Sequence, residues 1–369
     1  MSKPLIALSA GGTGGHVFPA EALASVLLER GYHLALITDK RGAAYGGTLG
    51  KLETFRISAG SIAGRGKLKV LRSALELGVG LIQARSILKR IRPAAMIGFG
   101  GYASVPGMAA AALAGIPTAI HEQNAVLGRA NRLLAGHVRR IATSFAEVSH
   151  VEPKLTQKLV HTGMPVRAGI LACRDTAYAE IGATGPIELL VLGGSQGARI
   201  LSEVVPAALA RLPEPLRTRI RISQQCRPED LDAVRRAYEG TGIDATLESF
   251  FADVPERLAG AHLVIARAGA STVAELTTLG RPAILVPYPF AIDDHQTANA
   301  HAAEDCGGAW LMQQDSFSPE SLADRLQSLF THPEALTRTA ACARNVGRPD
   351  AAEALADLVV GLIPKTSGA

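Results

Sequence analysis

Short apolar runs alternate along this chain with glycine-rich turns and with longer amphipathic stretches. Buried apolar strands that alternate with helices form parallel βαβ units with helices on both faces of the sheet. The sequence therefore predicts an α/β fold. The unit of strand, glycine turn and helix occurs at least four times, as LIALSAGGTGGHVFPAEALASVLLERG from Leu5, AAMIGFGGYASVPGMAAAALAG from Ala94, IELLVLGGSQGARILSEVVPAALARL from Ile187 and HLVIARAGASTVAELTTLG from His262. Further strands are predicted at residues 34–38, 117–120, 139–142, 219–223 and 282–287.

The two halves of the chain repeat this layout, which predicts two doubly wound Rossmann-like domains that face a cleft. A break in the pattern lies near residues 161–186, where HTGMPVRAGI is followed by polar sequence with Ala and Gly. We expect a first domain over residues 1–166 and a second over 167–347. The last helix, roughly Ala351–Leu362, and the rest of 348–369 are expected to pack back on the first domain, with a frayed KTSGA tail.

Composition narrows the class of protein. Apolar residues make up 47% of the 369 residues, enough for sizeable cores. No apolar stretch is long enough to cross a bilayer, and the N-terminal MSKPLIALSA has no signal-peptide pattern. The four cysteines are far apart and form no CxxC, which is typical of reduced, mostly structural thiols in a cytoplasmic protein: Cys173, Cys226, Cys306 and Cys342.

Positive charge is concentrated in one window. The net charge of the chain is +5, but residues 60–92 alone carry eight basic residues against Glu76, a net of +7. Apolar residues interleave with these cations. The window is either an amphipathic helix packed on the sheet with solvated charges, or a surface for anionic lipid. Nucleic acid is a poorer interpretation, because aromatic residues are 4% of the chain and none lies within the basic run.

The glycine loops indicate a ligand that carries phosphate. In open α/β sheets ligands bind beyond the carboxyl ends of the strands, where glycines let backbone N–H groups and a helix N-terminus approach phosphate oxygens. A tight turn without a ligand is the alternative for any single loop. No loop holds GKS or GKT, and none is a clean GxGxxG followed by an acid about 20 residues later. A nicotinamide cofactor is therefore disfavoured.

His16 follows the first glycine turn, in AGGTGGHVFPA at residues 10–20. Its ring could bond to backbone at the start of a helix. Alternatively, it could act as a general base or as an orienting hydrogen bond at the mouth of the cleft, because an imidazole with an unperturbed pKa near 6.5 suits proton removal at neutral pH.

Several motifs together resemble the MurG family, the UDP-N-acetylglucosamine transferases that complete the disaccharide of the bacterial cell-wall precursor. In chain order they are GGTGGHVFPA (11–20), GFGGYASVPG (98–107), HEQNAVLGRANRLLA (121–135), GMPVR (163–167), GGSQGAR (193–199), ARAGASTVAEL (266–276) and DDHQTANA (293–300). The resemblance implies a GT-B fold. It also implies inverting transfer of N-acetylglucosamine from UDP-N-acetylglucosamine to the 4-hydroxyl of N-acetylmuramoyl-pentapeptide linked by pyrophosphate to undecaprenol.

The resemblance assigns roles to residues of the first domain. Thr13, Gly14 and Gly15 match the loop that contacts the donor and faces the acceptor, and His16 matches the candidate base or acceptor-positioning residue. Asn124 matches a contact to the donor sugar.

Arg167 matches the hinge arginine that reaches the donor diphosphate, a role that suits a guanidinium because it can bond phosphate bidentately. Ser195 and Gln196 match the loop at the donor phosphates and the uracil-side backbone. Phe251 falls where the family's backbone pairs with uracil. Without the resemblance, Arg167 would be an ordinary surface arginine.

Two further residues complete the implied donor site. Glu275 matches a carboxylate on the ribose hydroxyls, and Gln296 matches a contact to the sugar hydroxyls. Taken alone, Glu275 could be an exposed acid in the first turn of a helix, and Gln296 could be an N-cap or a solvated residue.

The sequence also departs from the family. After the strand at 219–223 the family usually has a His-Gln-Ser/Thr-Gly run, and this chain has Ser223-Gln224-Gln225-Cys226. The missing glycine is expected to alter a turn beside the donor while activity is retained. GT-B enzymes of this kind typically need no bound metal, and no DxD motif is present, since Asp293 and Asp294 are adjacent. We expect no cofactor.

The implied acceptor carries a long lipid, so the enzyme is expected at the cytoplasmic face of the bacterial inner membrane as a peripheral protein. The basic window would then meet anionic lipid, and other cell-wall synthesis proteins are candidate partners. Two alternatives remain open. A UDP-sugar epimerase would share the donor site but need no second substrate, and a nucleotide-sugar binding protein would need no base.

Overall fold

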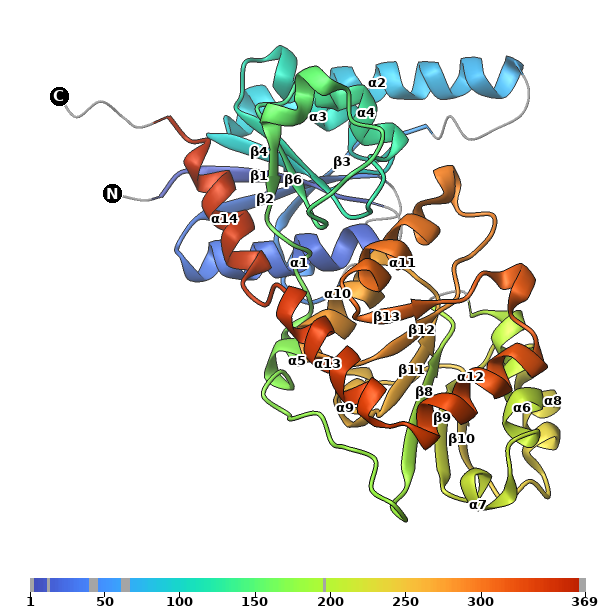
Figure 1. Ribbon diagram of the computed structural model, residues 1–369. Coiled ribbons are helices and arrows are strands. Elements are labelled where there is room, and N and C mark those ends of the chain that lie inside the picture. The colour runs from blue at the N-terminus through green and yellow to red at the C-terminus, as the bar shows by residue number, and fades with distance from the viewer. Residues whose placement is uncertain (1–2, 12–13, 40–45, 61–66, 195–196, 365–369) are drawn as a thin grey trace. The chain divides into compact units, whose positions relative to one another are not determined.

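The computed structural model describes residues 3–11, 14–39, 46–60, 67–194 and 197–364 (Figure 1). These residues form two compact units. The first unit runs to Arg167 and resumes at Arg348, and the second unit is Ala168–Gly347. The chain thus passes from one unit to the other twice, and Arg167 is the last residue of the first unit before the first passage.

The first unit is built on a parallel sheet with the strand order β3-β2-β1-β4-β5-β6-β7. Its elements are β1 (Leu5–Ser9), α1 (Gly14–Glu29), β2 (His33–Thr38), η2 (Leu49–Lys51), β3 (Glu53–Arg56), α2 (Lys67–Ile91), β4 (Ala95–Gly98), α3 (Val105–Leu113), β5 (Thr118–Glu122), α4 (Arg129–Ala135), β6 (Arg140–Thr143), η3 (Pro153–Lys158), β7 (Leu159–His161) and α14 (Ala351–Gly361).

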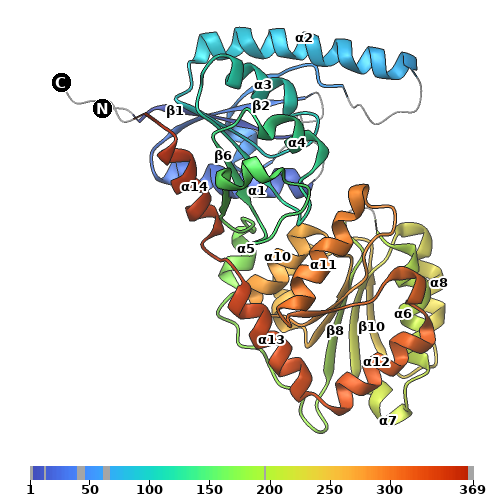
Figure 2. The same cartoon turned by 45° about the horizontal axis from the view of Figure 1, so that its top comes forward.

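Helices cover both faces of this sheet because side chains alternate along each strand. Ile6 and Leu8 of β1 pack in one apolar cluster with residues of α1 and α14. Ala7, between them, packs in a second cluster with residues of α2, α3 and α4. Figure 2 shows α14 beside α1, so the C-terminal helix completes the core of the first unit.

The second unit is built on another parallel sheet, with the strand order β10-β9-β8-β11-β12-β13. Its elements are α5 (Ala168–Ala172), β8 (Ile187–Leu192), α6 (Arg199–Ala210), α7 (Glu214–Arg217), β9 (Ile220–Gln225), η4 (Pro228–Asp230), α8 (Leu231–Tyr238), β10 (Asp244–Glu248), α9 (Val254–Gly260), β11 (Leu263–Ala266), α10 (Ala270–Leu279), β12 (Ala283–Leu285), η5 (Ile292–Asp294), α11 (His295–Asp305), β13 (Ala309–Leu311), η6 (Gln314–Ser316), α12 (Pro319–Thr331) and α13 (Glu334–Val346).

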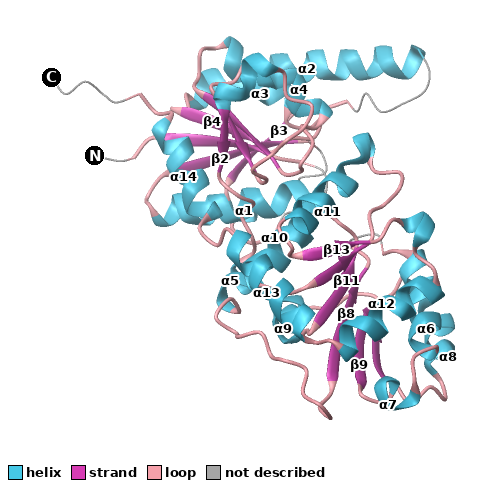
Figure 3. Cartoon of the chain, viewed as in Figure 1, coloured by secondary structure: helices cyan, strands magenta, loops and turns pink. Residues whose placement is uncertain are grey.

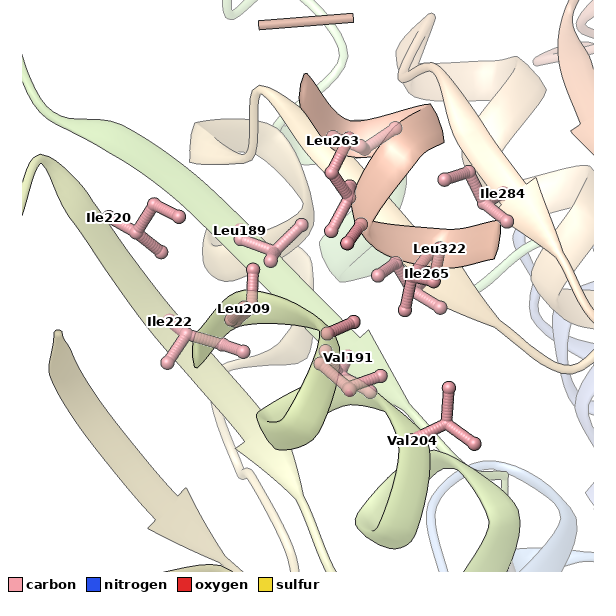
Figure 4. Packing of buried hydrophobic residues seen from close by; sticks show 14 of the residues in the cluster. Leu189, Val191, Val204, Leu209, Ile220, Ile222, Leu263, Ile265, Ile284 and Leu322 are labelled. Atoms are coloured by element: carbon pink, nitrogen blue, oxygen red, sulfur yellow. The ribbon is translucent and has the colours of Figure 1, made fainter. Parts of the chain in front are cut away.

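The core of the second unit is also formed by apolar strand residues packed against helices. Leu189 and Val191 of β8 lie against Val204 and Leu209 of α6, and Leu322 of α12 joins the same buried cluster (Figure 4). The other face of the sheet carries α9, α10 and α11, so each sheet lies between helices (Figure 3). The predicted fold class, two doubly wound parallel sheets, is confirmed, and the four predicted units are β1–α1, β4–α3, β8–α6 and β11–α10.

Each sheet has one topological switch point, where strand order reverses. It lies between β1 and β4 in the first unit and between β8 and β11 in the second. In open parallel sheets the loops that follow these two strands diverge and leave a crevice for ligands. The glycine-rich segments singled out in the sequence follow these four strands.

One buried cation ties the second unit together. The side chain of Arg281 is 1% exposed, and its guanidinium donates hydrogen bonds to the carbonyl oxygens of Ala259 (2.6 and 2.9 Å), Leu279 (3.0 Å) and Thr176 (2.8 Å). These carbonyls belong to the segment after α5, to the end of α9 and to the end of α10. Burial lowers the pKa of the Arg281 guanidinium from its usual value. Backbone oxygens therefore take the place of an acidic partner.

We expect Arg281→Met to lower the free energy of unfolding by about 2–4 kcal/mol, because it leaves several buried carbonyls without donors. Arg281→Lys should recover little of this, since an ammonium lacks the planar fork. Urea denaturation measures the effect. The control is Arg221→Met on β9, whose side chain is 59% exposed. An Arg281→Met midpoint equal to that of the control would contradict this interpretation.

Candidate functional site

His16 lies in the first turn of α1, directly after the glycine loop that follows β1. Its ring packs against the loop after β4: a Cβ added at Gly100 would lie 3.5 Å from Cε1 of His16, and one added at Gly101 would lie 3.5 Å from Nε2. Both glycines have a positive φ, 79° and 69°. The loops of the first switch point therefore meet at this imidazole.

A polar partner reaches His16 from the end of β5. Nδ1 of His16 lies 2.9 Å from Oε1 of Gln123, and Nε2 of Gln123 lies 3.0 Å from Nδ1 of His121. His121 is fully buried, and burial lowers the pKa of its imidazole to about 4. The ring of His16 thus contacts a side chain from the end of β5.

Glu122 organises the loop that carries Asn124. Its carboxylate accepts hydrogen bonds from the backbone N–H groups of Asn124 (3.0 Å) and Gly128 (2.9 Å), and from Nδ2 of Asn131 (2.7 Å). The side-chain amide of Asn124 also lies 3.4 Å from this carboxylate. Sequence reasoning selected only Asn124 from the HEQN run. The sequence feature that could have indicated His121, Glu122 and Gln123 is a run of polar residues directly at the end of a buried strand.

Arg167 and Phe18 form a pair in the first unit. The guanidinium carbon of Arg167 lies 5.3 Å from the centroid of the Phe18 ring, within the range of a cation–π contact. Gly14 is the first residue of α1, and a Cβ added there would lie 3.0 Å from the Phe18 ring. Gly15 follows it in the same turn. Thr13 lies outside the described residues. Arg167 is half-buried rather than an isolated surface arginine.

In the second unit, Gln225 connects two of the loops at the carboxyl edge of the sheet. Its Oε1 accepts a hydrogen bond from the backbone N–H of Gly193 (3.2 Å), and its Nε2 donates to the carbonyl of Ser249 (3.3 Å). Gly193 begins the loop that leads to α6. Ser195 and Gln196, predicted in that loop, lie outside the described residues.

The departure from the family pattern is accommodated without a glycine. Cys226 is buried, its backbone is not left-handed, and its N–H donates to the carbonyl of Glu248 (2.9 Å). A non-glycine residue therefore causes no backbone strain at this turn. Burial raises the pKa of the Cys226 thiol to about 11, which makes it a packing residue rather than a nucleophile.

Glu275 lies in the second turn of α10, the helix after β11, and is 7% exposed. The alternative that it is an exposed first-turn acid is therefore wrong. Nearby, the side chain of Asn299 on α11 donates to the carbonyl of Ala268 (3.0 Å) and fixes the loop between β11 and α10. The helix that carries this nearly buried acid is thus entered through a loop that a buried amide holds in place.

Gln296 lies in the first turn of α11, and its Oε1 accepts a hydrogen bond from the backbone N–H of Tyr288 (3.0 Å). The N-cap of this helix is Asp294, so Gln296 is not an N-cap. Arg267 also supports the loop at Tyr288: its guanidinium donates to the carbonyls of Val286 (3.1 Å) and Pro287 (2.9 Å) and lies 5.5 Å from the Tyr288 ring centroid.

Phe251 follows β10 and is buried beneath Arg257, whose guanidinium carbon lies 4.3 Å from the ring centroid. Arg257 is itself held by Ser223 (2.6 Å) and Asp253 (2.9 Å). The ring of Phe251 therefore anchors this turn. The backbone amide and carbonyl of Phe251 make no hydrogen bond within the described part of the chain.

Across the described ranges, no group of three or more His, Cys, Asp and Glu side chains is arranged to hold a metal ion. Within the same ranges, no helix combines the length and the apolar composition needed to span a bilayer.

Two family matches cover most of the chain. Residues 6–143 match the glycosyltransferase family 28 N-terminal domain, and residues 188–355 match the glycosyltransferase family 28 C-terminal domain. Each match spans one of the two switch points described above.

Full-length relatives agree with these matches. The chain is 90% identical over 367 residues to the UDP-N-acetylglucosamine–N-acetylmuramyl-(pentapeptide) pyrophosphoryl-undecaprenol N-acetylglucosamine transferase of Paramagnetospirillum magneticum, with 100% of this chain and 99% of the relative covered. It is 58% identical to the transferase of the same name from Rhodospirillum rubrum, with 97% and 92% covered.

A solved structure shares the fold over its whole length. The crystal structure of MurG from Acinetobacter baumannii superimposes with a TM-score of 0.79 at 30% identity, covering 97% of this chain and 99% of that one. The resemblance inferred from the motifs is confirmed. The chain belongs to glycosyltransferase family 28, among the UDP-N-acetylglucosamine–N-acetylmuramyl-(pentapeptide) pyrophosphoryl-undecaprenol N-acetylglucosamine transferases.

Proposed function

We propose that this chain transfers N-acetylglucosamine from UDP-N-acetylglucosamine to the 4-hydroxyl of undecaprenyl-pyrophosphoryl-N-acetylmuramoyl-pentapeptide, with inversion at the sugar carbon. The observation that carries this proposal is the 90% identity, over the full chain, to a transferase named for this reaction. The arrangement of polar groups at both switch points supports it.

The proposed chemistry is a single displacement. The acceptor oxygen attacks the anomeric carbon from the face opposite the diphosphate, while the bond from that carbon to the phosphate oxygen breaks and its electron pair leaves with UDP. His16 takes the proton of the acceptor hydroxyl. Charge that develops on UDP is stabilised by main-chain N–H groups at the starts of α6 and α10 and by the guanidinium of Arg167.

The two units take different substrates in this proposal. The second unit binds the donor: the backbone of Phe251 pairs with uracil, Glu275 accepts hydrogen bonds from the ribose hydroxyls, and Gln296 contacts the sugar. The free backbone groups of Phe251 and the burial of Glu275 support these roles.

The first unit faces the acceptor and the membrane. Its loop at Gly14 and Gly15 and the side chain of Asn124 contact the substrates from that unit. Thr13, Ser195 and Gln196 stay predictions from the resemblance.

The basic helix α2 has two different faces, which supports a membrane role. Gly80, Ala84 and Leu88 are buried against the unit, whereas Leu75, Val79 and Ile82 are 64%, 48% and 72% exposed. The exposed residues recur at helical spacing on one stripe.

A basic hollow of about 660 Å³ lies at the C-terminal end of α2, and Arg85, Lys89 and Arg92 line it. One face of α2 thus packs against the unit, and the exposed stripe and these cations support the proposal that the other face meets anionic lipid. We place the enzyme peripherally on the cytoplasmic face of the inner membrane, where other cell-wall synthesis proteins are candidate partners.

The decisive experiment is a transfer assay with labelled UDP-N-acetylglucosamine and a lipid-linked acceptor analogue. We expect His16→Ala to lower kcat by about 10²-fold or more with donor binding unchanged, because it removes a general base. His33→Ala, at an exposed histidine, is the control. Turnover of the donor without acceptor would favour an epimerase, and donor binding with no transfer by the wild type would favour a binding protein. Full transfer by His16→Ala would rule out His16 as the base.

We expect Gln225→Ala to raise the KM for the donor about threefold to tenfold with a smaller change in kcat, because the loop at Gly193 loses its tether to the turn at Ser249. Steady-state kinetics with varied donor measures this. Gln83→Ala is the matched control, since Gln83 also holds a backbone N–H, that of Ser58 (2.7 Å), but in the first unit. Equal KM values for the two variants would argue against a role of Gln225 at the donor.

We expect Leu75→Ser with Ile82→Ser to weaken binding to vesicles of mixed anionic and zwitterionic lipid about tenfold or more, because two apolar side chains no longer enter the interface. Charge reversal at Lys67, Lys69 and Arg72 should weaken binding chiefly at low salt. Leu133→Ser, at a 56% exposed residue of α4, is the control. Vesicle sedimentation that does not distinguish these variants from the wild type would refute the docking surface.

A further inference from the structure

A line of polar contacts runs from the backbone at Gly163 to His16. Nε2 of His121 lies 3.2 Å from the carbonyl oxygen of Gly163. Nδ1 of His121 lies 3.0 Å from Nε2 of Gln123, and Oε1 of Gln123 lies 2.9 Å from Nδ1 of His16. Three side chains, His121 and Gln123 from the end of β5 and His16 from α1, are thus connected in series.

The direction of each hydrogen bond follows from the end of the line. A carbonyl oxygen only accepts, so Nε2 of His121 carries a hydrogen and donates it to Gly163. The ring is fully buried, and burial keeps its pKa at about 4, so near neutral pH it holds one hydrogen only. Nδ1 of His121 is therefore an acceptor, and the amide of Gln123 donates to it.

A second contact fixes the amide of Gln123 in the same orientation. Nε2 of Gln123 also lies 3.0 Å from the backbone carbonyl oxygen of His121, which can only accept. The amide nitrogen therefore faces His121, and the amide oxygen faces His16. Because an amide oxygen accepts, Nδ1 of His16 must carry the hydrogen that joins them.

We propose that Gln123 and His121 are positioning residues that hold neutral His16 as the Nδ1–H tautomer, so that Nε2 is the nitrogen that takes the acceptor proton. This inference rests on the proposed transfer reaction. When Nε2 accepts the proton of the sugar hydroxyl, Nδ1 still donates to Gln123. The line of hydrogen bonds is therefore the same before and after proton transfer, and no group in it has to turn.

The surroundings suit this assignment. Nε2 is on the edge of the ring that faces Gly101, where a Cβ would lie 3.5 Å from it. The other titratable group at the end of β5, Glu122, directs its carboxylate to the loop from Asn124 to Gly128 and to Asn131. His16 and His121 are thus the two titratable rings along the line, and His16 further lowers the pKa of His121.

The direct test is nitrogen-15 NMR of the histidine rings in the full-length protein, with the His16 signals assigned by their loss in His16→Ala. We expect Nδ1 of His16 to be protonated and Nε2 unprotonated above neutral pH. Gln123→Met removes the acceptor, so the hydrogen should redistribute toward Nε2. We expect kcat to fall about tenfold to a hundredfold with the donor KM unchanged.

Gln123→Glu is the conservative variant. Its carboxylate can still accept from Nδ1 of His16, so it should retain more activity than Gln123→Met. An added negative charge favours the protonated imidazole, and the acid limb of the pH–rate profile should therefore move to higher pH. This shift would show that His16 is the group that titrates in the reaction, and the tautomer of His16 in Gln123→Met separates a positioning role of Gln123 from a purely structural one.

His161→Asn is the matched control. His161 lies on β7 and its Nε2 bonds to the carbonyl of Ser144 (3.2 Å), outside the line to His16, so kcat and the pH profile should be unchanged. A wild-type spectrum with the hydrogen on Nε2 of His16 would overturn the proposal, as would wild-type kcat in folded Gln123→Met. Absence of transfer by the wild type would instead count against the proposed function, because the NMR result does not depend on turnover.

Discussion

Both units of this protein depend on the constraint that a parallel sheet imposes. Every strand must be covered on both faces, and all strands present their carboxyl ends at one edge. In the first unit, β1 and β4 send their helices to opposite faces of the sheet, and the start of α1 and the segment 99–104 lie at that edge on the two sides of the switch point. β8 and β11 do the same in the second unit. The positions of His16 and of the loop at Gly193 follow from strand order before any particular side chain is considered.

Polar side chains, buried for Glu122 and Asn299 and half-buried for Gln225, then fix the loops at these edges. Glu122 satisfies the amides of the loop after β5, Gln225 joins the loops after β8 and β10, and Asn299 holds the loop after β11. Each is a side chain bonded to the backbone of a loop. A loop fixed in this way presents its remaining N–H groups in one arrangement, and that preorganisation lets main-chain amides stabilise charge on a diphosphate.

The sequence was sufficient to predict the central strands of both sheets and insufficient to predict the edge strands. All strands predicted from apolar runs were found, but β3, β7, β10 and β13 were missed, and these four are the outermost strands of the two sheets. β10 has no buried residue, so it lacks the apolar signal. The site residues also divide into features that the sequence could predict and features that it could not. Glu275 could be recognised from its motif, but its burial depends on how α10 packs. Gln123 could not be linked to His16, because 107 residues separate them and only the folded sheet brings them together.

The choice of an amide at position 123 has a chemical consequence. A carboxylate in that place would also orient the imidazole, but it would stabilise the protonated form by charge and would have to be desolvated beside buried His121. An amide orients the ring through geometry alone, and its second end is satisfied by His121 without a net charge. The disadvantage is that the side-chain amide can rotate by half a turn, which would place its NH2 group, a donor, against Nδ1 of His16. Neutral His121, bonded to Gly163, prevents this, because it offers only an acceptor to the amide nitrogen. The buried histidine is therefore what makes an uncharged partner sufficient to orient His16 for the proposed role as a base.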